Sequence, residues 1–167
     1  MAPCVLFGLL FAQVWQKIGA TDMMLCQAAG NEGRYDEAIP HCRAAVKTDP
    51  NAINYNQLGW FLALDGQPKE ALKACKRAVA LEPIPTYYDS LAMALAIDGQ
   101  GAKALETEQL YVLDDSREPT PGQQVTLGMI YFSVGRKDDA HREWEGARAT
   151  RNRTAARLAL EFEAKYY

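Results

Sequence analysis

The chain has 167 residues, of which 49% are hydrophobic and 23% charged, enough for one ordinary domain with a buried core. Its formal net charge of −3 and its pI near 5.4 argue against nucleic-acid binding by the protein as a whole. The charge is uneven, because Arg148, Arg151, Arg153 and Arg157 make the C-terminal part basic. Such a cluster indicates either favourable charges at helix ends or a docking patch for an acidic partner.

Residues 1–18 form an apolar N-terminal segment, with eight large apolar side chains between Val5 and Trp15. The apolar stretch is shorter than the roughly 20 residues that a membrane-spanning helix needs. A signal peptide cleaved near Ala20 would make the protein exported or periplasmic. No Lys or Arg precedes the apolar stretch. This favours a retained, cytoplasmic N-terminal helix, which we expect to be buried against the first repeat or in a groove, because exposure of each large apolar side chain costs about 1.5–3 kcal/mol.

The rest of the chain repeats itself around Gly33, Gly66, Gly99 and Gly135, which are 33, 33 and 36 residues apart. On both sides of each glycine, apolar residues recur at intervals of three and four, which indicates two amphipathic helices joined by a tight turn. One such pair cannot bury its own apolar face, so consecutive pairs must stack.

The repeat predicts an all-α fold, an α-α superhelix of about four helix pairs followed by a capping helix. The expected repeats span residues 19–51, 52–84, 85–120 and 121–153, and the capping helix lies within 154–167. The expected helices cover residues 21–32, 36–48, 52–65, 69–81, 86–98, 102–113, 122–134, 138–149 and 154–165.

Three features carry a family resemblance: Leu58-Gly59 and Leu127-Gly128 in first helices, alanines seven residues apart in second helices, and Pro50 and Pro83 after them. Together they resemble the tetratricopeptide repeat family over roughly residues 19–152. The resemblance implies that first helices line a concave groove. The sites that it assigns to peptide binding are Met23, Gln27, Asn56, Trp60, Leu64, Asp89, Met93, Ile97, Val125, Met129 and Phe132.

These groove sites are apolar in character. Trp60, Met93 and Met129 hold equivalent positions in successive repeats, and no Lys or Arg stands at any of the sites. The cationic groove with which some family members grip acidic C-terminal tails is therefore not supported. A groove lined by methionine and aromatic side chains suits an apolar helix or extended peptide. The alternative is that these side chains simply pack against adjacent helices.

The cysteines and histidines show no catalytic or metal-binding pattern. Cys4, Cys26, Cys42 and Cys75 form no CxxC motif, which favours buried free thiols. Cys26 and Cys42 should nevertheless face each other, because an antiparallel helix pair that turns at Gly33 brings them together; an oxidising compartment would allow a bridge. No metal site, cofactor or enzymatic activity is expected.

Two functions remain open at the level of sequence. The first is a non-catalytic protein–protein interaction module that binds an apolar peptide or helix in its concave groove. The second is a structural subunit of a larger assembly, which would contact a membrane through residues 2–16. Another protein or peptide is the expected partner in the first, and nucleic acid is not.

Overall fold

The computed structural model describes residues 21–113 and 117–166. The expectations for residues 1–18 lie outside these ranges. Within the described ranges the chain is helical, with no strand. A helix over residues 21–31 comes first. It is followed by α2 (Tyr35–Thr48), α3 (Ala52–Leu64), α4 (Pro68–Leu81), α5 (Pro85–Ile97), α6 (Gly101–Tyr111), α7 (Pro121–Ser133), α8 (Lys137–Arg148) and α9 (Arg153–Tyr166).

The helix boundaries follow the local signals in the sequence. Gly33, Gly66, Gly99 and Gly135 all adopt φ between 77° and 82°, a backbone conformation that other residues rarely take. Each ends the first helix of a pair. At the start of α7, the Thr120 hydroxyl accepts a hydrogen bond from the backbone N–H of Gln123, whose side chain accepts one from the Thr120 N–H. The predicted helices are confirmed, with ends that differ by one or two residues.

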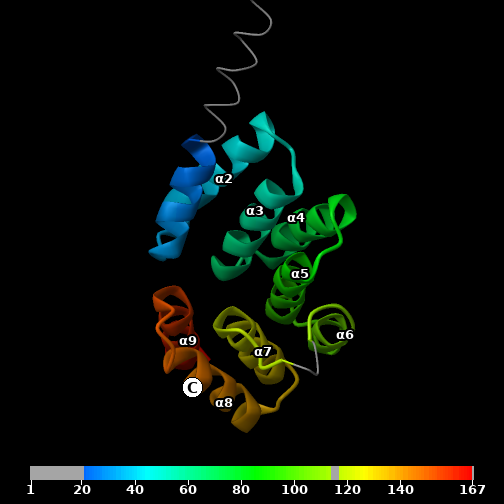
Figure 1. The fold of residues 1–167 in the computed structure, drawn as a ribbon, viewed down its shortest axis with the longest axis vertical. Coiled ribbons are helices and arrows are strands. Elements are labelled where there is room, and N and C mark those ends of the chain that lie inside the picture. Colours follow the sequence, from blue (N-terminus) through cyan, green and yellow to red (C-terminus); the bar gives the residue numbers. More distant parts are fainter. Residues whose placement is uncertain (1–20, 114–116, 167) are drawn as a thin grey trace, which may run out of the picture.

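The helices stack as pairs into a superhelix. Within pairs, α3 packs on α4, α5 on α6 and α7 on α8, while α3, α5, α7 and α9 contact one another in succession. The first helices face a common inner side, and α4, α6 and α8 lie outside them (Figure 1). The all-α tetratricopeptide-like architecture predicted from the repeat is therefore confirmed.

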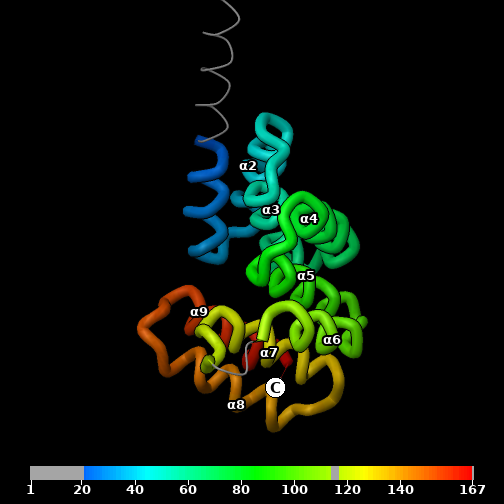
Figure 2. Tube along the Cα trace, turned by 45° about the vertical axis from the view of Figure 1, so that its right-hand side comes forward, coloured from blue at the N-terminus to red at the C-terminus, as the bar shows by residue number. Residues whose placement is uncertain are grey.

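The two ends of the stack differ. At the C-terminal end, α9 covers the last pair with a buried face of Ala155, Leu158, Ala159 and Phe162. At the other end, Met24 and Leu25 are 70% and 44% exposed. The stack also curves strongly: both views place α9 beside the C-terminal end of the helix over residues 21–31 (Figures 1 and 2). Among the described helices, none is both long and apolar enough to cross a bilayer.

Candidate binding surface

The residues assigned to the groove divide into two groups by exposure. Four of them are buried: Asn56, Met93, Val125 and Met129, with at most 7% of their surface exposed. Six are half-buried, namely Met23, Trp60, Leu64, Asp89, Ile97 and Phe132, and Gln27 is exposed. Met93 and Met129 thus belong to the core as the chain stands, although they hold sites equivalent to Trp60.

Four of the half-buried groove residues are large apolar side chains on the inner helices α3, α5 and α7. Trp60 and Leu64 lie on α3, Ile97 on α5 and Phe132 on α7, and all four pack at the margin of the main hydrophobic core. Because α3, α5 and α7 contact one another in succession, these side chains come from adjacent helices. We call these four residues the inner apolar set.

Cations border the surface at its C-terminal end. The Lys137 ammonium lies 5.8 Å from the centre of the Phe132 ring, and the Arg136 guanidinium lies 4.3 Å from that of Tyr131. Both distances are within the range of cation–π attraction. Both cations come from the start of α8 or the turn before it, so the assignment of groove sites to first helices alone did not include them.

Asp89 faces inward to a second carboxyl group rather than to solvent. It interacts with Glu108 of α6 and with the Thr126 hydroxyl of α7. Glu108 is completely buried, and burial, followed by the neighbouring Asp89 charge, raises its pKa well above the ordinary carboxyl value. Burial likewise raises the pKa of Asp89. The folded chain therefore favours the protonated form of both carboxyl groups.

Glu108 has a signal in the sequence that the repeat analysis overlooked. When the repeats are aligned on their glycines, Glu108 occupies the position that Cys42, Cys75 and Trp144 hold in the other helix pairs. All four residues are at most 1% exposed. A glutamate at a site otherwise filled by cysteine or tryptophan marks a departure from the pattern of the core.

The repeat position held by Glu108 also accounts for the disulfide in the first helix pair, because the two helices of each pair approach most closely there. Cys26 and Cys42 are 16 residues apart, and the corresponding pairs are Gly59/Cys75, Ala92/Glu108 and Gly128/Trp144. A Cβ added to Gly59 would overlap the Cys75 sulfur, and one added to Gly128 would overlap the Trp144 ring. This is the point of closest approach within a pair, and in the first pair both positions carry cysteine.

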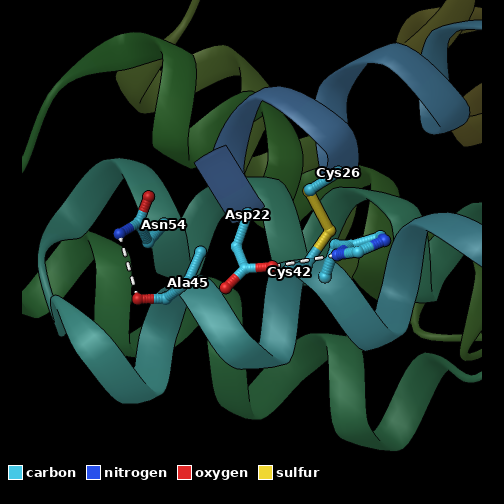
Figure 3. Close-up of a disulfide and its surroundings, with 6 residues drawn as sticks. Asp22, Cys26, Cys42, Ala45 and Asn54 are labelled. Carbon is cyan, nitrogen blue, oxygen red and sulfur yellow. Dashed lines mark hydrogen bonds and ion pairs between the residues drawn. A yellow bond between two sulfur atoms is a disulfide. The ribbon is translucent and has the colours of Figure 1, made fainter. Parts of the chain in front are cut away.

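Cys26 and Cys42 are bonded to each other, with their Cα atoms 5.1 Å apart (Figure 3). The expectation that they face each other is confirmed, and the expectation of free thiols is wrong for both. The close approach of the two helices brings the sulfurs within bonding distance. Cys75 is a buried free thiol, as expected, and burial raises its pKa to about 12. Cys4 lies outside the described residues.

Both histidines lie beside carboxylates, and the two carboxylates beside His141 also pair with Arg148. His41 Nδ1 lies 3.0 Å from an Asp22 carboxylate oxygen, close to the disulfide. His141 Nδ1 lies 3.0 Å from Glu163, and its Nε2 lies 3.6 Å from Glu145. Within residues 21–113 and 117–166, no group of three or more His, Cys, Asp or Glu side chains is arranged to hold a metal ion.

Comparison with known proteins supports the architecture. A tetratricopeptide repeat model matches residues 23–51 and 52–85. The two matched segments are the first two helix pairs, and the later pairs repeat their construction. A search of curated proteins finds no match. Repeats of this family generally mediate protein–protein interaction and are typically not catalytic. Residues 23–85, which form the first two helix pairs, therefore match the tetratricopeptide repeat family.

Proposed function

We propose that this protein binds an apolar helix or extended peptide of a partner protein against the inner apolar set. The observation that carries the proposal is the partial exposure of Trp60, Leu64, Ile97 and Phe132 on three consecutive first helices. A partner that covers them would remove apolar surface from water, which is favourable in proportion to the area buried. Met23 and Gln27, two further groove sites, would extend this surface along the helix over residues 21–31.

Trp60 is the expected anchor of the interaction, because large aromatic side chains often dominate binding energy. The test uses peptides selected from a random peptide library against the full chain, with affinities measured by calorimetry. Trp60→Ala should weaken the best peptide by more than about 1 kcal/mol, roughly fivefold or more, while the helical circular dichroism signal stays unchanged. Tyr111→Ala is the matched control, because Tyr111 is a 49% exposed aromatic residue on α6, outside the inner layer.

Salt provides an independent check of the character of the surface. Affinity should change little as salt is raised, because ion pairs would contribute little to an apolar contact. The opposite pattern would contradict the proposal: affinity that collapses in salt, survives Trp60→Ala and falls on substitution of Arg148, Arg151 and Arg153. Arg148 is already paired with Glu163 at 2.5 Å, whereas Arg151 and Arg153 are exposed. That result would move the binding site to the basic C-terminal end.

A second candidate function is a structural subunit of a larger assembly. It is favoured by Leu25, which is 44% exposed, whereas the equivalent Leu58 of the next repeat is only 7% exposed because a preceding pair covers it. A subunit stacked on this end would cover Leu25 in the same way. Light scattering of the full chain, compared with a variant that lacks residues 1–17, separates the two functions. A soluble monomer in both cases favours the peptide-binding module.

A further inference from the structure

The turn at Gly33 and the helix α9 meet through the side chain of Arg157. The Arg157 Nη1 and Nη2 atoms donate to the Tyr35 hydroxyl oxygen at 3.3 and 3.4 Å, across 122 residues of sequence. The guanidinium carbon lies 5.9 Å from the centre of the Tyr35 ring. A Cβ added to Gly33 would lie 2.8 Å from Arg157 Nη1, so the guanidinium also rests against the backbone of this turn.

Both sides of this contact are built into the fold. Arg157 is held from its own helix by an ion pair with Glu161, one turn further along α9. Tyr35 begins α2, and its ring lies 6.2 Å from that of Phe61, a buried residue of α3. The contact therefore connects the capping helix, through Tyr35, to the same inner helix that carries Trp60.

The contact is also weak enough to open. A hydrogen bond to a neutral hydroxyl contributes modestly to stability because water replaces it in the open form. Arg157 keeps a quarter of its side-chain surface exposed, so water already reaches it. The neighbouring basic residue Arg153, one turn earlier in α9, is exposed.

We propose that Arg157 and Tyr35 form a latch that holds the two ends of the superhelix together and narrows the inner side, and that the latch must open for a partner to reach the inner apolar set. The second part rests on the proposed function. A solenoid changes its curvature through small rotations between successive repeats, so one contact between its ends can restrict the whole inner side. A closed form in equilibrium with an open form reduces apparent affinity by the fraction that is open.

Two measurements test the latch, both on the full chain. The first is the radius of gyration from small-angle X-ray scattering, without any ligand. Arg157→Ala should increase the radius of gyration, and Arg153→Ala on the same helix should not. Tyr35→Phe keeps the ring and removes only the acceptor, so it should act in the same direction as Arg157→Ala if that variant fails to fold. An unchanged radius in folded Arg157→Ala and Tyr35→Phe overturns the latch.

The second measurement is the association rate of the best library-selected peptide. Arg157→Ala should raise this rate by about three- to tenfold, the range expected when a contact of this size no longer holds the closed form. A larger radius with an unchanged association rate overturns the control of access while the latch itself stands. Failure to select any peptide contradicts the proposed function, and the scattering result still decides the latch.

Discussion

Glu108 is the residue that departs most from its surroundings. It is fully buried in α6, and neither of its carboxylate oxygens accepts a hydrogen bond within the described residues. Glu108 forms a carboxyl pair with Asp89 of α5. The other groups that interact with this pair are Cys75 of α4 and Thr126 of α7. None of these groups is cationic. Ionisation of both carboxyl groups would therefore leave two buried negative charges side by side, which is unfavourable.

The pair should make stability depend on pH. Both carboxyl pKa values are raised in the folded state by burial. Above about pH 4 the folded chain holds protons that the unfolded chain has released. The stabilising contribution of this pair is therefore greatest below about pH 4, and it is lost as pH rises through the folded pKa values. Glu108→Gln should stabilise the protein at pH 8 by about 1–3 kcal/mol, because the amide donates to Asp89 without ionising.

Thermal unfolding at pH 5 and at pH 8 measures this effect. The gain from Glu108→Gln should be larger at pH 8 than at pH 5. Glu106→Gln, on the exposed side of the same helix, is the control and should change little at either pH. A loss of stability in Glu108→Gln at pH 8 would contradict the inference that ionised Glu108 destabilises the fold.

At the scale of helices, the close approach within each pair decides which residues fit. Gly59 of α3 packs on α4, and a Cβ there would overlap the Cys75 sulfur and lie 3.0 Å from the Cys75 backbone nitrogen. The backbone of α4 cannot move aside without loss of packing elsewhere. Gly59→Ala should therefore destabilise the protein by about 1–3 kcal/mol, even though alanine favours a helix more than glycine does.

Gly122 provides the comparison. It lies in the first turn of α7, and a Cβ there would meet no atom within 4 Å. Gly122→Ala should leave stability unchanged or raise it slightly, because alanine restricts the unfolded chain. Denaturant unfolding of the two variants measures the difference. Equal stabilities would refute the packing argument for Gly59.

At the scale of the whole molecule, the helix over residues 21–31 is a terminal element of the described stack. A disulfide that holds this helix in place therefore contributes more to stability than one between two central helices would. Each inner helix from α3 onward is covered by pairs on both sides or by α9. Cys26–Cys42 joins the helix over residues 21–31 to α2 across a separation of 16 residues. In the chain-entropy model, closing a loop of this length stabilises the folded state by about 3 kcal/mol.

Loss of the bridge should be measurable in the melting temperature. Cys26→Ala with Cys42→Ala should lower Tm by roughly 6–12 °C, from about 3 kcal/mol in a chain of this size. A reductant should lower the Tm of the unmodified protein and have no further effect on the double variant. Cys75→Ala controls for the loss of a buried sulfur and should keep its response to reductant. A Tm of the unmodified protein that is insensitive to reductant would exclude a stabilising bridge.

The sequence by itself determined the helices, their pairing and the resemblance to tetratricopeptide repeats. The glycine spacing defines where each pair turns, and the apolar periodicity defines which faces are buried, so local signals are sufficient for these features. The repeat also placed Cys26 opposite Cys42, because an antiparallel pair about a known turn leaves little freedom. Only the tertiary structure decided that Met93 and Met129 are buried while Trp60 is partly exposed, that Asp89 meets Glu108, and that Arg157 reaches Tyr35. These outcomes depend on the small rotation between successive pairs, which accumulates along the stack and which no single repeat encodes.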